Sequence, residues 1–224
     1  VGLIEAEGFC SRDAGGNLTG FNVETARLLC QRMGASCRLE VMSLTDVISG
    51  VSEGRVQIGF GNLLKSPERE QVMLFSHPYW RSSSIFIGAP ALADLALPAQ
   101  LAGKRVAVQT GSRQHAWAKA QRHGAQVVEV AHADGVMAAL INGDADLGLL
   151  PMVVALNYLK SEQGKRFDFI GSPTDSDGLG GSVHIVVSKD RPDLLSGLDK
   201  VLDASVRDGS LHALSRRFLP FDVY

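Results

Sequence analysis

The stretch Gln31–Val41 reads QRMGASCRLEV, and Gln121–Val130 reads QRHGAQVVEV about ninety residues later. In both stretches a helical pattern ends at a glycine, and an alternating run that favours a β-strand follows. Gly54 and Gly143 continue the correspondence at nearly the same offset. An ordered set of matches at one offset indicates an internal repeat. We therefore predict two similar α/β lobes, in which strands alternate with helices.

Hydrophobic periodicity and turn residues predict matching elements in the two repeats. The first repeat is expected to contain helix Asn22–Met33, strand Arg38–Val41, helix Ser43–Glu53 and strand Val56–Phe60. The second is expected to contain strand Arg105–Gln109, a helix from Ser112 to about His123, strand Val127–Val130, helix Asp134–Asn142 and strand Ala145–Leu150. Asn22 and Ser112 are expected to cap their helices, and Ser43 with Asp46 has the spacing of a capping box.

Two apolar runs, Ile85–Ile87 and His184–Val187, are expected to cross between the lobes. The second lobe is then an insertion in the first. The predicted limits are residues 1–87 with 183–224 for the first lobe, and 88–182 for the second. The tail is expected to add helices Pro192–Val206 and Ser210–Phe218 to the first lobe. Two crossings form a hinge, and the cleft between two lobes is where small ligands bind.

The composition narrows the classes of function. The 224 residues are 45% hydrophobic and 21% charged with a net charge of −2, and no basic run marks a nucleic-acid partner. No apolar run is long enough to span a bilayer. The abrupt beginning at Val1 would fit a mature chain from which a signal peptide has been removed, although a trimmed sequence would look the same.

Two cysteines seven positions apart, Cys30 and Cys37, admit several interpretations. A zinc site needs about four ligands and no second pair accompanies them, while redox chemistry of the thioredoxin type uses a shorter C-x-x-C spacing. A turn at Gly34 could bring the two close enough for a disulfide, which would indicate an oxidising compartment. Two reduced, buried thiols are the alternative. Cys10 is left over as a buried free thiol, and neither a metal nor a cofactor is expected.

The stretch GNLLKSPER, Gly61–Arg69, follows a predicted strand directly. Ser66 is expected to cap a short helix with Pro67 at its first position. Arg69 then falls in the first turn, where the helix dipole disfavours a cation. It is either a surface arginine near acidic neighbours or a clamp for an anion, because guanidinium grips a carboxylate with two parallel hydrogen bonds.

The stretch QTGSRQ, Gln109–Gln114, is a second candidate binding turn, because a strand ends, Gly111 turns and a helix opens. The N–H groups at the start of such a helix attract anions, and Arg113 adds a cation. Gly and Ser also occur in such turns for structural reasons alone. Catalysis is less well supported, because no nucleophile elbow or phosphate-binding loop is present. Four scattered histidines are expected to be structural: His77, His115, His132 and His184.

The residues now match a known family. Five segments resemble the family 3 periplasmic solute-binding proteins, which serve ABC importers of polar amino acids and opines: GFNVETARLLCQRMGASC, GNLLKSPEREQVMLFSHPYW, LAGKRVAVQTGSRQ, INGDADLGLL and RDGSLHALSRRFLPFDVY. The likeness is greatest to the lysine/arginine/ornithine- and histidine-binding group and covers nearly the whole chain. It implies the bilobal type II clamshell of periplasmic binding proteins. It also implies a short-loop disulfide between Cys30 and Cys37.

The resemblance implies roles for individual residues. Arg69 matches the arginine that binds the α-carboxylate of the ligand. Gly61, Asn62 and Leu64 match the segment that lines the same site. In the second lobe, the matching turn is formed by Gly111, Ser112 and Arg113.

Several positions depart from the family pattern. Pro151 stands near the place of an aspartate that meets the α-ammonium of the ligand. Leu3 and Asn22 stand near two acidic positions that meet a cationic side chain. The aromatic lid near the N-terminus is missing, and Ala6 or Phe9 is nearest to its place. A threonine of the second-lobe turn is replaced by an arginine in this chain.

We therefore hypothesise an acidic or amine-poor ligand, since a buried ammonium without a counter-charge costs several kcal/mol. An organic acid, an acidic amino-acid derivative or an opine would fit. Three acidic residues near these places could instead restore a partner for an ammonium: Glu5, Glu7 and Asp177.

The resemblance implies an extracytoplasmic, monomeric binding protein that delivers its ligand to the membrane permease of an ABC transporter. The sensor domain of a histidine kinase is the first alternative, because the same fold serves there. A cyclohexadienyl dehydratase is a weaker alternative, because Leu150–Met152 offer no acid to act on a substrate ring.

Overall fold

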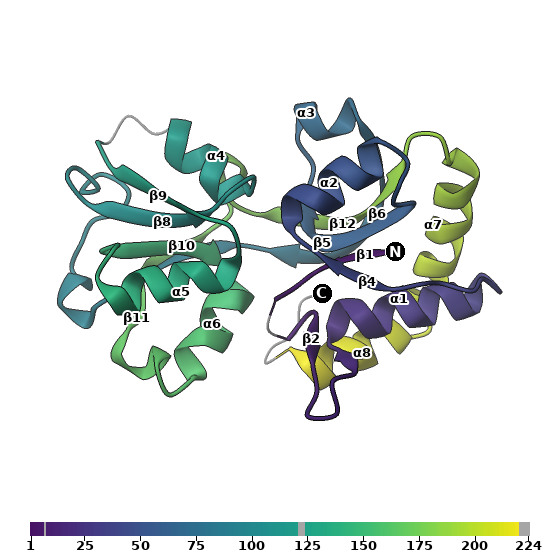
Figure 1. Ribbon diagram of the computed structural model, residues 1–224, viewed down its shortest axis with the longest axis horizontal. Helices are drawn as coiled ribbons and strands as arrows, with labels where there is room; N and C mark the ends of the chain where they lie inside the picture. Colours follow the sequence, from purple (N-terminus) through teal and green to yellow (C-terminus); the bar gives the residue numbers. More distant parts are fainter. Residues whose placement is uncertain (7, 121–123, 220–224) are drawn as a thin grey trace. The chain divides into compact units, whose positions relative to one another are not determined.

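The computed structural model describes residues 1–6, 8–120 and 124–219. They form two compact units, unit 1 with Val1–Arg81 and Ser182–Tyr224, and unit 2 with Ser82–Gly181. Each unit is a five-stranded sheet with helices on its faces (Figure 1). This confirms the predicted fold class of two α/β lobes. The segment of unit 2 lies between the two segments of unit 1 in the sequence.

Unit 1 is built on a mixed sheet with the strand order β4-β1-β5-β12-β6. Its strands are β1 Gly2–Ile4, β4 Glu40–Met42, β5 Ile58–Leu64, β6 Met73–Ser82 and β12 Gly181–Ser188, with a small hairpin of β2 Ser11–Arg12 and β3 Leu18–Thr19. Its helices are α1 Phe21–Arg32, α2 Leu44–Ser52, α3 Pro67–Glu70, α7 Pro192–Arg207 and α8 Ser210–Phe218. Strand β1 runs parallel to β4 and β5, and β12 runs antiparallel to β5.

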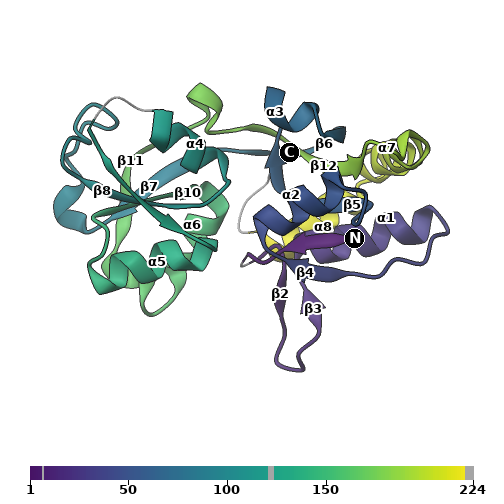
Figure 2. The same cartoon turned by 45° about the horizontal axis from the view of Figure 1, so that its top comes forward.

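The two faces of the unit 1 sheet carry different cores. Helix α2 covers one face, where aliphatic side chains such as Val47, Leu63 and Val186 pack together. Helices α1 and α8 lie at the other face (Figures 1 and 2). There, Phe21 of α1 stacks on Tyr79 of β6, with ring centroids 5.9 Å apart. Both faces therefore exclude water from the strands that lead to the candidate site.

Unit 2 has the strand order β11-β7-β10-β8-β9. Its strands are β7 Ser84–Gly88, β8 Arg105–Gln109, β9 Gln126–Val130, β10 Leu147–Pro151 and β11 Asp168–Thr174. Its helices are α4 Arg113–Ala120, α5 Ala133–Asn142 and α6 Met152–Lys160, with short 3₁₀ turns η1 Pro90–Leu92, η2 Gly164–Arg166 and η3 Ser176–Gly178. Helix α4 lies on one face of the sheet, and α5 and α6 lie on the other (Figure 1).

The predicted crossing runs have another place in the structure. Ile85–Ile87 lies within β7 and His184–Val187 within β12, so each run belongs to the sheet of a single unit. The chain changes unit at Arg81–Ser82 and again at Gly181–Ser182. Burial in a sheet explains the apolar character of these runs as well as a crossing would.

Most predicted helix starts are confirmed, with one exception. Ser43 Oγ accepts a hydrogen bond from the Asp46 N–H at 3.1 Å, as its capping spacing predicted. Ser112 Oγ accepts one from the His115 N–H at 3.0 Å. The predicted cap Asn22 is wrong, because α1 begins at Phe21 and Gly20 holds the capping position without a side-chain bond. The end predicted for the second-lobe helix, His123, lies outside the described residues.

The disulfide between Cys30 and Cys37 is present, with the two Cα atoms 6.2 Å apart. It joins the last turn of α1 to the segment that leads into β4. Cys10 is a buried free thiol, as expected. Burial, with a smaller contribution from Glu5, raises the pKa of the Cys10 thiol to about 11, so this sulfur is protonated and unreactive at neutral pH.

Candidate functional site

Strand β5 is distorted where the predicted ligand segment lies. Its pairing with β12 passes from Leu63 opposite His184 to Gly59 opposite Val186, so β5 carries two extra residues in between. Asn62 lies in this bulge with a φ of 57°, a left-handed conformation that few residues other than glycine adopt. A bulge interrupts the ladder and redirects side chains, and it is frequent beside binding sites. The sequence predicted a strand that ends at Phe60, so the continuation through Gly61 and Asn62 is new.

A buried hydrogen-bond chain holds Asn62. The Tyr79 hydroxyl donates to Asn22 Oδ1 at 2.8 Å, and Asn22 Nδ2 donates to Asn62 Oδ1 at 3.3 Å. Tyr79 and Asn22 are each 1% exposed. Asn22 is therefore an interior residue of α1 whose side chain serves as the link between β6 and the bulge of β5.

Arg69 lies in the short helix α3 directly after β5. Ser66 caps this helix by accepting from the Arg69 N–H at 3.3 Å, with Pro67 at the first position as predicted. The guanidinium Nη1 donates to the Leu64 carbonyl at 3.0 Å. This bond holds the Arg69 side chain against the end of β5. The bulge at Asn62 is only seven residues earlier in the chain.

In unit 2, the turn between β8 and α4 has the predicted form. Gly111 has a φ of 76°, and its N–H donates to His115 Nδ1 at 3.2 Å. His115 Nε2 lies 3.3 Å from Glu129 Oε1. The contacts with Lys119, at 2.6 Å, and with His115 lower the pKa of the Glu129 carboxyl. The histidine therefore fixes the turn, which agrees with its predicted structural role.

Arg113 is held against η3. Its Nε donates to the Gly178 carbonyl at 3.2 Å. A Cβ at Gly178 would lie 1.9 Å from Arg113 Nη2, so a side chain there would displace the guanidinium from its present position. One residue further along α4, Gln114 Nε2 donates to Ser84 Oγ at 2.8 Å, and Ser84 Oγ in turn donates to the Leu179 carbonyl. The start of α4 is thus tied to η3 twice.

The residues that depart from the family pattern lie in different environments. Leu3 and Phe9 are fully buried in unit 1, and Phe9 stacks on Trp80 with centroids 5.2 Å apart. Pro151 ends β10 opposite Ser84 and precedes α6. Ala6 forms an isolated β-bridge with Cys10.

The three acidic residues that could replace the missing partners of an ammonium are placed only in part. Glu5 is exposed, and Asp177 is exposed with a φ of 53°. Glu7 lies outside the described residues.

Tyr79 and Gly178 are contributors that the sequence did not reveal. Each contacts a candidate residue far along the chain, and neither belongs to a local motif. In the sequence, the left-handed position was indicated only by the triplet FGN in β5, because asparagine tolerates a positive φ better than most residues do.

Two histidines have opposite environments in unit 1. His184 is buried and its Nδ1–H donates to the Ser76 carbonyl at 2.7 Å, and burial lowers its pKa. His77 is exposed on β6, where its Nδ1 lies 3.0 Å from Asp203 Oδ1 and its backbone N–H donates to Asp199 at 2.7 Å. The hydrogen bond to Asp203, together with the charge of Asp199, raises the pKa of His77. Both join neighbouring elements, as structural histidines do.

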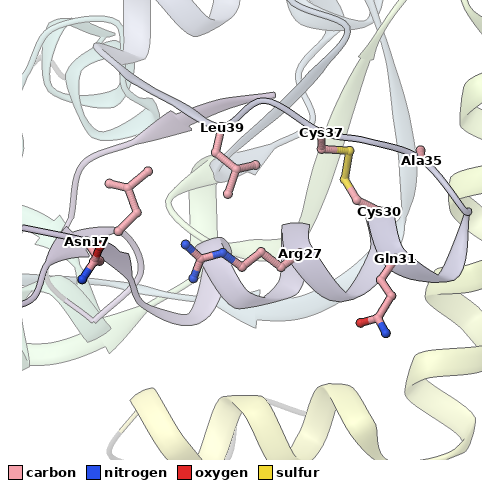
Figure 3. A pocket seen from close by; sticks show the side chains of 8 residues that line it. Asn17, Arg27, Cys30, Gln31, Ala35, Cys37 and Leu39 are labelled. Carbon is pink, nitrogen blue, oxygen red and sulfur yellow. A yellow bond between two sulfur atoms is a disulfide. The ribbon is translucent and has the colours of Figure 1, made fainter.

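A groove of about 450 Å³ follows α1 beside the disulfide (Figure 3). Asn17 lies near one end, the Cys30–Cys37 bond near the other, and Leu39 lies between them. None of the residues assigned to the ligand lines it. In the ranges 1–6, 8–120 and 124–219, no three His, Cys, Asp or Glu side chains are grouped as ligands for a metal. Within the same ranges we find no helix with the length and hydropathy that a membrane span requires.

Comparisons with known proteins agree with this architecture. Residues 2–221 match the family model described as bacterial extracellular solute-binding proteins, family 3. The lysine/arginine/ornithine-binding periplasmic protein of Escherichia coli K12 is 28% identical over 220 residues, covering 96% of this chain and 85% of the relative. The histidine-binding periplasmic protein of Salmonella typhimurium is 26% identical, with the same two coverages. An ancestral arginine-binding protein solved with arginine has a TM-score of 0.87 at 24% identity, covering 97% of this chain and 96% of that one.

Proposed function

Because the chain belongs to the bacterial extracellular solute-binding proteins, family 3, we propose that it binds a small carboxylate-bearing ligand outside the cytoplasm and delivers it to the membrane permease of an ABC importer. The ligand is an amino acid, an amino-acid derivative, an opine or an organic acid. The relatives in the comparison are named as binding proteins for lysine, arginine, ornithine or histidine, which supports import of amino-acid-like solutes rather than catalysis.

The observation that carries the proposal is the arrangement of Arg69 beside the bulge of β5. Its guanidinium is anchored at the Leu64 carbonyl, close in the chain to the left-handed Asn62. An anchored, planar guanidinium suits bidentate recognition of a carboxylate, because less side-chain entropy is lost on binding. The resemblance also assigns Gly111–Arg113 to the ligand, and the anchoring of Arg113 on Gly178 supports a second fixed cation for an anionic group.

Neutral residues at the acidic positions of the family support the finer proposal of an acidic or amine-poor ligand. Asn22 is an amide committed to Tyr79 and Asn62, Pro151 carries no charge, and Leu3 is fully buried. A buried ammonium without a counter-charge costs several kcal/mol, so a basic amino acid would bind poorly.

A thermal-shift screen of refolded, ligand-free protein tests both levels. Each α-amino acid is paired with its amine-free acid, and opines and dicarboxylates are included. A ligand at about a thousand times its Kd adds roughly 4 kcal/mol, which raises Tm by roughly 8–16 °C. Larger shifts with amine-free or acidic compounds support the finer proposal, and the largest shift with lysine, arginine or histidine contradicts it.

Arg69 provides the specific test. We expect Arg69→Ala to abolish the shift and Arg69→Lys to restore only part of it, because a lysine lacks the bidentate fork. The exposed Arg38 of the same unit is a matched control, and Arg38→Ala should leave the shift unchanged. Unchanged affinity in Arg69→Ala would refute the carboxylate clamp.

A further inference from the structure

One position that departs from the family pattern adds a charge instead of removing one. Pro151, Leu3 and Asn22 are neutral residues near acidic positions of that pattern. Arg113 stands at the place of a threonine, so a neutral side chain is replaced by a cation. All these departures make the residues assigned to the ligand more positive. The missing acids explain a ligand without an ammonium, but the added guanidinium calls for a further negative group.

The guanidinium of Arg113 has hydrogen-bond donors that the protein does not use. Its Nε donates to the Gly178 carbonyl at 3.2 Å. In the described part of the chain this is the one hydrogen bond of the side chain, and no carboxylate forms an ion pair with it. The residue is half-buried, and neither Nη1 nor Nη2 is among the buried atoms without a partner, so both nitrogens reach solvent. Their N–H groups form the planar fork that fits a carboxylate.

The same guanidinium is held at a fixed place within unit 2. It lies against the backbone of Gly178, where a Cβ would overlap Nη2. The next residue, Gln114, is 6% exposed and donates to the fully buried Ser84 Oγ at 2.8 Å. Ser84 Oγ donates in turn to the carbonyl of Leu179, the residue after Gly178. An arginine anchored in this way loses little conformational freedom on binding, which suits a residue that selects the ligand.

We propose that Arg113 determines specificity for a ligand with two anionic groups, a dicarboxylate, whose second carboxylate binds to Nη1 and Nη2 of this residue. The inference rests on the proposed function, in which Arg69 binds the first carboxylate. It narrows the ligand from acids in general to diacids, because a monocarboxylate would leave the anchored guanidinium without a counter-charge.

Matched pairs of compounds test the proposal by titration of the full chain: succinate with succinamate, glutarate with glutaramate, N-acetylglutamate with N-acetylglutamine, and the best acid of the thermal-shift screen with its monoamide. The second member of each pair has a neutral amide of nearly the same size in place of one carboxylate. We expect the diacid of the tightest pair to bind at least about tenfold more tightly than its monoamide, because hydrogen bonds between charged groups are the stronger ones. Equal affinities within every pair, or a monocarboxylate that binds more tightly than every diacid, overturn the proposal and leave the proposed function standing. If no carboxylate binds at all, both are wrong.

Variants of unit 2 assign the preference to Arg113. Arg113→Gln removes the charge but keeps a stem with a donor, so the preference for the diacid should fall to about equality. Gly178→Ala keeps the charge but displaces the guanidinium and should also reduce the preference. Arg166→Gln removes the same charge from the exposed turn η2 and should leave the preference unchanged.

The preference is a ratio of two affinities within one variant, so a general loss of stability does not imitate its disappearance. Arg69→Ala should abolish binding of both members of each pair, which tests the proposed function separately. A preference that persists in Arg113→Gln refutes the role of Arg113. An equal loss for both members in Arg113→Gln would place its guanidinium on the carboxylate that they share, and the second anionic group would then be wrong.

Discussion

Removing one hydroxyl from the Tyr79–Asn22–Asn62 chain should measurably destabilise unit 1. In Tyr79→Phe the ring keeps its packing against Phe21, and the 2.8 Å bond to Asn22 Oδ1 is lost. Because Asn22 is 1% exposed, water does not readily replace the donor. A buried acceptor left unsatisfied costs about 1–3 kcal/mol. We expect a loss of about 2 kcal/mol, which lowers Tm by roughly 4–8 °C for a chain of this size.

Urea unfolding followed by circular dichroism measures this loss, and a double-mutant cycle with Asn22→Ala isolates the bond. Residues in one network show a coupling energy of about 0.5–3 kcal/mol, so the double variant should lose clearly less than the sum of the single variants. We also expect weaker binding of the best ligand of the screen, because the bulge around Asn62 loses its anchor. A loss below about 0.5 kcal/mol with additive single variants would refute the reasoning.

Three further predictions concern other parts of the chain. Gly178→Ala and Gly143→Ala both place a Cβ at a left-handed glycine, and each should lower the free energy of unfolding by about 1–2 kcal/mol. Because Gly178 contacts the guanidinium of Arg113 and Gly143 does not, Gly178→Ala should also weaken ligand binding in a titration, whereas Gly143→Ala should not. Replacing Cys30 and Cys37 by serine opens a seven-residue separation and should cost about 2–3 kcal/mol, seen as a Tm lower by roughly 4–12 °C, whereas an unchanged Tm would contradict this. The pKa of His77 is raised in the folded state, so protonated His77 stabilises the fold below its ordinary pKa, and this contribution disappears as pH rises through the raised value. His77→Gln should therefore lower the free energy of unfolding at about pH 5.5 and leave it unchanged at about pH 9.

Elements that depend on local chemistry could be predicted from the sequence. The capping residues Ser43 and Ser112 and the strand Arg105–Gln109 have the predicted places. The tail helices are also present, as Pro192–Arg207 and Ser210–Phe218. In each case a side chain within a few residues satisfies the backbone or the apolar period determines the element.

The candidate site could be predicted only in part, because its geometry depends on distant contacts. The bulge of β5 arises from a register shift in its pairing with β12, a strand that lies more than a hundred residues later in the chain. Asn22 has the residue type of a helix cap, but Phe21 precedes it inside the helix and Tyr79 accounts for its buried amide. Arg113 could be named as a cation, but its anchor on Gly178 lies 65 positions away.

The direction of the hydrogen bonds around Asn22 connects its chemistry to the proposed ligand. Tyr79 donates to Asn22 Oδ1, so the amide nitrogen of Asn22 is the group that donates to Asn62 Oδ1. This leaves the Asn62 amide with its Nδ2 hydrogens as the donors at the end of the chain. An aspartate at position 22 could accept from Tyr79 but could not donate to Asn62, so the Asn62 amide would have to turn over and donate its Nδ2–H to the aspartate. With asparagine at position 22, the Asn62 Nδ2 is instead left as a donor, which is the hydrogen-bonding role that the proposed carboxylate-bearing ligand requires.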